Sequence, residues 1–154
     1  MAVTMADITK LRKMTGAGMM DCKKALEEAN NDFDGAIEII RKRGQAIAAK
    51  REDREAAEGC VLATSKGDYA AIVALKCETD FVAQNKDFVA LTQKILDAAI
   101  ENKPADLEAL KAIKLDGRTI AELVTDQSGV TGEKMELGYF DSLSAASTIF
   151  YIHP

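Results

Sequence analysis

GCVLATSKGDYAAIVALKC, residues 59–77, is the stretch that decides the fold class of this chain. β-branched and small apolar residues lie on both sides of a Gly67-Asp68 turn signal. This combination is typical of two antiparallel strands joined by a tight turn. The sequence therefore predicts a β-hairpin over residues 59–77.

Helices and further strands are predicted after this hairpin. Large apolar residues recur at helical spacing over residues 85–102, which indicates a long amphipathic helix that ends before Pro104. A later helix begins at Thr119, a residue type that caps helices well. The remaining expected elements are a short helix at 105–113, the capped helix at 119–129, and strands at 134–143 and 147–152.

Residues 5–44, before the hairpin, predict a small helical bundle. Apolar residues recur three and four positions apart, and Gly or Asn follows each run. The expected helices cover 5–15, 19–29 and 33–43, with Gly44 as the end of the third. Such a bundle of about 40 residues is near the lower limit of size for independent stability.

The order of these elements predicts the class α+β, a helical bundle followed by an antiparallel sheet with helices. Residues 45–58 are rich in alanine and charge, so a helical linker is expected between the two parts. The apolar strand at 147–152 would leave an unpaired edge near the chain end. We therefore expect the chain to be a fragment of a longer protein.

Charge and hydropathy exclude several kinds of partner. The net charge is −5, with +1 on residues 1–56 and −6 on residues 57–154. The basic cluster at 41–44 falls in the last turn of an expected helix, where cations complement the helix dipole. Phosphate backbones require clustered Lys and Arg, and a membrane span requires about 20 apolar residues in a row. Neither a nucleic acid nor a membrane is expected as a partner.

Residues suited to catalysis or metal binding are few. Cys22, Cys60 and Cys77 are odd in number and have no C-x-x-C spacing, which indicates reduced thiols in a cytoplasmic protein. The single histidine, His153, lies next to the last residue, so it is poorly placed as a catalytic base. No phosphate-binding glycine loop or metal-ligand cluster is present in the sequence. The sequence predicts a protein that is not an enzyme and has no cofactor or metal, with a thiol enzyme as the weaker alternative.

Two pairs of adjacent apolar residues indicate a binding protein. Met19-Met20 begin a helix, and Phe81-Val82 follow the helix-starting residues Thr79 and Asp80. Adjacent helical positions point about 100° apart, so one buried stripe cannot easily hold both members of a pair. The alternatives are that both methionines pack into the bundle and that Phe81 is a hydrophobic staple. From the residues alone, these packed alternatives are favoured.

Three segments carry a resemblance to a known family. They are LRKMTGAGMMDCKKALEEANND at 11–32, KRGQAIAAKR at 42–51 and CETDFVAQNKDF at 77–88. Together they resemble bacterial elongation factor Ts, the guanine-nucleotide exchange factor for the translation GTPase elongation factor Tu. The resemblance implies a ubiquitin-associated-like three-helix domain at 1–44, a linker at 45–58, a first core α+β subdomain at 59–145, and the start of a truncated second core subdomain at 146–154.

The resemblance also implies the residues that contact the GTPase domain of Tu. In the family, the Phe of the T-D-F-V element wedges between helices of the GTPase, and the preceding Asp helps displace groups near magnesium and the phosphates. GDP release is thereby promoted in translation elongation, without covalent chemistry. The implied contacts are Arg12, Met19, Met20, Lys23, Thr79, Asp80, Phe81 and Val82, with His153 as a further candidate.

An alternative function from another class is a non-catalytic scaffold or peptide-binding interaction domain that uses the bundle. The oligomeric state stays open, because the strand at 147–152 could pair with its own sheet or be exchanged with another copy. By resemblance, the missing second subdomain reaches the third domain of Tu. We therefore expect weaker exchange activity from this chain than from a full-length protein.

Overall fold

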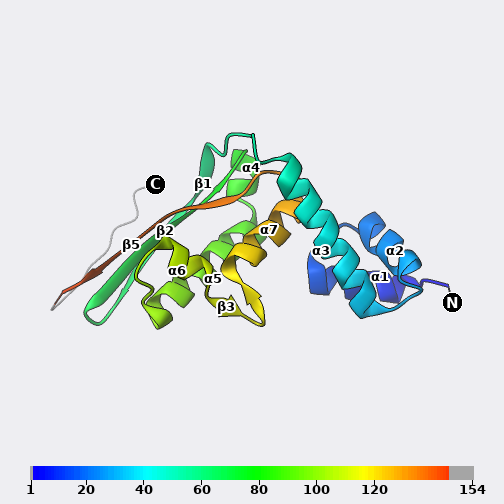
Figure 1. The fold of residues 1–154 in the computed structure, drawn as a ribbon, viewed down its shortest axis with the longest axis horizontal. Helices are drawn as coiled ribbons and strands as arrows, with labels where there is room; N and C mark the ends of the chain where they lie inside the picture. The colour runs from blue at the N-terminus through cyan, green and yellow to red at the C-terminus, as the bar shows by residue number, and fades with distance from the viewer. Residues whose placement is uncertain (1, 146–154) are drawn as a thin grey trace. The chain divides into compact units, whose positions relative to one another are not determined.

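The computed structural model describes residues 2–145 and confirms the class α+β (Figure 1). The chain divides into two compact units, residues 1–53 with 125–133 and residues 54–124 with 134–154. Each unit has its own cluster of buried apolar side chains. The domain boundaries expected from the sequence stay predictions, and the strand expected at 147–152 lies outside the described residues.

The first unit contains the predicted helices α1 (Met5–Thr15), α2 (Met19–Glu28) and α3 (Phe33–Lys50). A capping box starts α1: the Asp7 amide donates to the Thr4 hydroxyl oxygen, and the Thr4 amide donates to the Asp7 carboxylate. Gly16 ends α1 at φ +75°, a left-handed conformation that favours glycine. The helices enclose a small core made of Ile8, Leu11, Ala17, Cys22, Ala25, Leu26 and Ala36.

Gly44 does not end α3, and that prediction was wrong. The helix continues to Lys50, into the segment expected to be a linker. Gly44 is buried, and a Cβ added to it would lie 3.6 Å from the Cα of Gly129 in the same unit. A Cβ on Gly129 would clash with the backbone of Gly44. The glycine therefore permits a close approach of backbones rather than a helix end.

The second unit is built on a three-stranded antiparallel sheet in the order β1-β2-β5. β1 (Glu58–Lys66) and β2 (Tyr69–Cys77) form the predicted hairpin, with Lys66 paired to Tyr69 across the turn. β5 (Glu136–Ser144) pairs with the other edge of β2 and is the third predicted strand. β2 is therefore central, and every second residue along it is buried.

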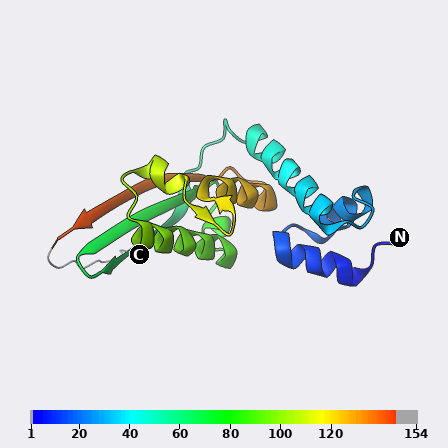
Figure 2. The ribbon, with the colours of Figure 1, turned by 60° about the horizontal axis from the view of Figure 1, so that its bottom comes forward.

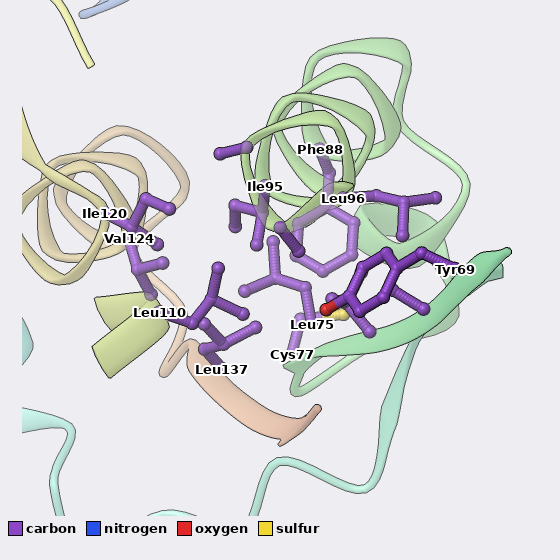
Figure 3. Close-up of a cluster of buried hydrophobic side chains, with 14 residues drawn as sticks. Tyr69, Leu75, Cys77, Phe88, Ile95, Leu96, Leu110, Ile120, Val124 and Leu137 are labelled. Carbon is purple, nitrogen blue, oxygen red and sulfur yellow. The ribbon is translucent and has the colours of Figure 1, made fainter. Parts of the chain in front are cut away.

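Helices cover one face of this sheet (Figures 1 and 2). α5 (Lys86–Asn102) is capped by Asn85, whose side-chain oxygen accepts from two amides of the first turn, and it ends at Lys103 before Pro104. α4 (Asp80–Ala83), α6 (Leu107–Lys111) and the start of α7 (Ile120–Thr131), up to Val124, complete the helical layer of this unit. The shared core, shown in Figure 3, includes Tyr69, Leu75, Cys77, Phe88, Ile95, Leu96, Leu110, Ile120, Val124 and Leu137.

A second, two-stranded sheet was missed by the sequence analysis. β3 (Lys114–Leu115) and β4 (Arg118–Thr119) form a minimal hairpin between α6 and α7. Its turn residues Asp116 and Gly117 both have positive φ, as a type I′ hairpin turn requires. The Asp-Gly dipeptide was the available signal, but strands this short have no readable periodicity.

Candidate functional site

The T-D-F-V element forms a short corner between β2 and α4. β2 ends at Cys77 and α4 begins at Asp80, with Thr79 in an extended conformation as the N-cap. The Val82 amide donates a hydrogen bond to the Thr79 hydroxyl at 3.4 Å. Thr79 is thus the cap that the sequence predicts, and it orients the first turn of α4.

Phe81 and Val82 face opposite environments. Phe81 exposes 84% of its surface, whereas Val82 is half-buried and packs against the core of the second unit. The alternative that Phe81 is a hydrophobic staple is therefore wrong. Asp80 is also exposed, in the first turn of α4, where a carboxylate interacts favourably with the helix dipole. The corner presents an aromatic ring and a carboxylate side by side in sequence.

Contacts on the N-terminal side hold this corner to the rest of the second unit. The Cys77 thiol donates to the backbone carbonyl of Thr79, with 3.2 Å between sulfur and oxygen. One carboxylate oxygen of Glu78 lies 3.2 Å from the Arg54 guanidinium, and the other accepts the Lys134 amide at 2.7 Å. Sequence reasoning missed Glu78, because Arg54 and Lys134 lie 24 and 56 residues away along the chain.

The contact residues expected in the first unit are all exposed. Met19 exposes 41% and Met20 exposes 63% of its surface, so the alternative that both methionines pack into the bundle is wrong. Arg12 and Lys23 are also exposed, on α1 and α2 respectively. We call Arg12, Met19, Met20 and Lys23 the methionine surface; it belongs to the first unit, whereas the T-D-F-V corner belongs to the second.

The cysteines do not form a reactive thiol site. Cys22 and Cys77 are buried, and Cys60 is half-buried. Burial raises the pKa of the Cys22 thiol and that of the Cys60 thiol above the ordinary value, which leaves less reactive thiolate at neutral pH. The burial of the cysteines and the raised pKa values of Cys22 and Cys60 both argue against the thiol-enzyme alternative.

The part of the chain that the structure describes offers neither a metal site nor a membrane-spanning helix. Within residues 2–145, no group of three or more His, Cys, Asp or Glu side chains could hold a metal ion. In the same part of the chain, no helix is long and apolar enough to cross a membrane. His153, the further candidate contact, lies outside the described residues.

Comparison with known proteins identifies the family. A family model described as Elongation factor TS matches residues 78–154, which is half of the chain and begins at Glu78 of the corner. The chain belongs to the elongation factor Ts family. The resemblance predicted from the sequence is therefore confirmed.

Individual members of the elongation factor Ts family match the chain from end to end. Elongation factor Ts of Porphyromonas gingivalis is 68% identical over the whole chain, which covers 57% of that protein. Elongation factor Ts of Parabacteroides distasonis is 67% identical over 99% of the chain, which covers 46% of that protein. Elongation factor Ts of Bacteroides thetaiotaomicron is 63% identical over 99% of the chain, which covers 46% of that protein. The chain thus spans about half the length of the curated relatives it matches.

Proposed function

We propose that this chain promotes GDP release from elongation factor Tu, as a guanine-nucleotide exchange component of translation elongation in the cytoplasm. Membership of the elongation factor Ts family supports the class of function. The single observation that carries the mechanism is Phe81, an aromatic side chain that is 84% exposed on a capped turn anchored to a strand end. An exposed aromatic in a rigid setting suits insertion into a partner.

The proposed mechanism is insertion of Phe81 between helices of the GTPase, with Asp80 displacing groups near the magnesium ion and phosphates. No bond is made or broken by the chain itself. Thermodynamic linkage makes the effect reciprocal. If the factor lowers the affinity of the GTPase for nucleotide by a given ratio, nucleotide lowers the affinity of the GTPase for the factor by the same ratio. The chain acts by stabilising the nucleotide-free form of its partner.

Energetics require contacts beyond Phe81. Weakening nucleotide binding about a thousandfold takes roughly 4 kcal/mol of coupling. Burying one large apolar side chain contributes about 1.5–3 kcal/mol. Phe81 alone therefore falls short, and we assign the remainder to Asp80, to Thr79 and Val82 beside it, and to the methionine surface.

The methionine surface is proposed to hold the GTPase domain while the corner acts. Met19 and Met20 are adaptable apolar side chains, and both are exposed at the start of α2. Arg12 on α1 and Lys23 on α2 add exposed positive charge to the same unit, which favours a partner surface with acidic groups around an apolar centre. His153 stays a further candidate contact.

The test is the release of fluorescent mant-GDP from elongation factor Tu with and without this chain. We expect faster release that saturates with chain concentration, and slower maximal release than with a full-length relative. A release rate independent of the chain would contradict the proposal.

The scaffold alternative is not favoured by the family match. A pull-down with Tu separates the two functions. An exchange factor predicts a complex that GDP disrupts, whereas a scaffold predicts no GDP-sensitive complex.

A further inference from the structure

Glu78 connects three parts of the second unit at the base of the T-D-F-V corner. Its Oε2 atom lies 3.2 Å from Nη1 of Arg54, and its Oε1 atom accepts the backbone amide of Lys134 at 2.7 Å. Arg54 and Lys134 are the first residues of the two sequence segments that make up this unit. Glu78 itself directly precedes the cap residue Thr79. One carboxylate therefore joins the corner to both places where the chain enters the unit.

This arrangement differs from an ordinary surface ion pair. The Glu78 side chain is only 15% exposed, although its partner Arg54 is 52% exposed. Both of its oxygens have donors from distant parts of the chain, one of them a backbone amide whose position is set by the fold. A carboxylate held from two directions in a largely water-excluded place is more rigid than one held by a single long side chain.

The ring of Phe81 needs such support from outside itself. Because 84% of its surface is exposed, packing of the ring contributes little to holding its position. The turn that carries it is a four-residue helix, which is too short to be stable alone. Its direction depends on the cap at Thr79, on Val82 packed against the core, and on the backbone leading out of β2.

We infer that Glu78 is a positioning residue for the Asp80–Phe81 turn, an inference that rests on the proposed exchange function. Its carboxylate fixes the backbone before the cap, so that Phe81 is presented to the GTPase in one orientation. Glu78 touches neither nucleotide nor metal in this role. Loss of this support is expected to slow exchange by about tenfold, which corresponds to roughly 1.4 kcal/mol of lost coupling.

A double-mutant cycle tests whether Glu78 acts through Phe81. The rate of mant-GDP release from Tu is measured at saturating chain for the unaltered chain, Glu78→Ala, Phe81→Ala and the double variant. We expect Glu78→Ala to lower the stimulated rate about tenfold in the unaltered chain and less than about twofold in the Phe81→Ala background. Equal fold-losses in both backgrounds would overturn the inference.

Two further variants separate positioning from a change of charge. Glu58→Ala is the matched control, because this replacement also removes one negative charge. Glu58 is exposed and pairs with Cys77 across the hairpin. The replacement should leave the exchange rate unchanged. Glu78→Gln keeps an oxygen that can accept the Lys134 amide but loses the ion pair with Arg54, so its rate should lie between those of Glu78→Ala and the unaltered chain.

A second measurement does not depend on Tu. Hydrogen–deuterium exchange of the Val82 amide, which donates to Thr79, should be faster in Glu78→Ala, while the amide of Val73 in the centre of β2 should exchange as before. Unchanged protection of the Val82 amide would overturn the inference. If the unaltered chain does not accelerate GDP release, the proposed function fails. Hydrogen–deuterium exchange of the Val82 amide then decides by itself whether Glu78 holds the turn in place.

Discussion

The buried thiol of Cys77 donates a hydrogen bond to the backbone carbonyl of Thr79, with 3.2 Å between sulfur and oxygen. Cys77 is the last inward-facing residue of β2, and Thr79 is the N-cap of the helical turn that carries Phe81. The bond thus links the core of the second unit directly to the turn that carries Phe81, the most exposed aromatic side chain among residues 2–145. A flexible loop at this place could not hold Phe81 outward, whereas a capped turn fixed to a central strand can.

Phe81→Ala should abolish most of the exchange activity while leaving the fold intact. The ring is 84% exposed, so its removal deletes few contacts within the chain, and it deletes the group that we propose inserts into the partner. We expect at least a tenfold lower rate of mant-GDP release and a change of less than about 0.5 kcal/mol in the free energy of unfolding by urea.

Val61→Ala is the control for this prediction. Val61 is an exposed apolar residue of the same unit, on β1, and exposes 51% of its surface. Its replacement should leave the exchange rate unchanged and lower the free energy of unfolding by less than about 1 kcal/mol. A strongly destabilised Phe81→Ala variant would show instead that the ring is a structural residue.

Met20→Ala should weaken the complex with Tu and leave the maximal rate of exchange almost unchanged. Met20 is 63% exposed at the start of α2 and lies in a different unit from Phe81, so it is expected to hold the partner rather than to displace the nucleotide. The concentration of chain that gives half-maximal release should rise about tenfold, equivalent to roughly 1.4 kcal/mol.

Met5→Ala is the matched control, since Met5 is equally exposed, at 61%, on α1 of the same unit. The concentration of Met5→Ala that gives half-maximal GDP release should equal that of the unaltered chain. The same rise for both variants would mean that the first unit has no specific methionine contact.

Gly59→Ala should destabilise the chain much more than Gly138→Ala. A Cβ at residue 59 would lie 2.5 Å from the Leu75 carbonyl oxygen and 3.1 Å from the Cα of Lys76, both backbone atoms of the neighbouring strand. At residue 138, which is the extra residue at the register shift between β2 and β5, the obstructing atoms belong to the flexible Lys76 side chain.

Urea unfolding of the two glycine variants checks this difference. We expect a loss of about 1–3 kcal/mol for Gly59→Ala and less than about 1 kcal/mol for Gly138→Ala. Similar losses for both would contradict the assignment of the steric conflict to the backbone.

Stability in acid should depend on the capping box of α1. Hydrogen bonds from the side chain and the backbone of Thr4 lower the pKa of Asp7 below its ordinary value. A carboxyl group with a lowered pKa stabilises the folded state above the pKa of the unfolded chain, which is about 4. This contribution is lost as the pH falls through the lower, folded-state pKa.

Urea unfolding between pH 7 and pH 2.5 measures this effect. The stability advantage of the unaltered chain over Asp7→Asn should be present at pH 7 and shrink below pH 4. In a Thr4→Ala background, the same replacement should show a weaker dependence on pH, because the Thr4 hydroxyl, the largest single cause of the lowered pKa of Asp7, is absent while the Thr4 backbone amide and Asn31 remain. A pH dependence of equal size in both backgrounds would exclude the Thr4 side chain as its cause.

Local patterns explain the parts of the fold that could be predicted. The β-hairpin at 59–77, the cap at Thr79 and the helix after Asn85 depend on residues within a few positions of each other, and the structure confirms all three. Gly44 was misjudged because its role is set by Gly129, 85 positions away in sequence, and not by its own neighbours. The partners of Glu78 were missed for the same reason, since Arg54 and Lys134 become its neighbours only in the folded chain.

The T-D-F-V corner separates what the local sequence determines from what the tertiary structure determines. The period of the helix alone determines that Phe81 and Val82 cannot both face inward, because adjacent positions point about 100° apart. Which of the two is buried depends on where the sheet and α5 lie, and these are assembled from residues far apart along the chain. Only the tertiary structure therefore decides that Val82 packs against the core and that Phe81 is directed to solvent.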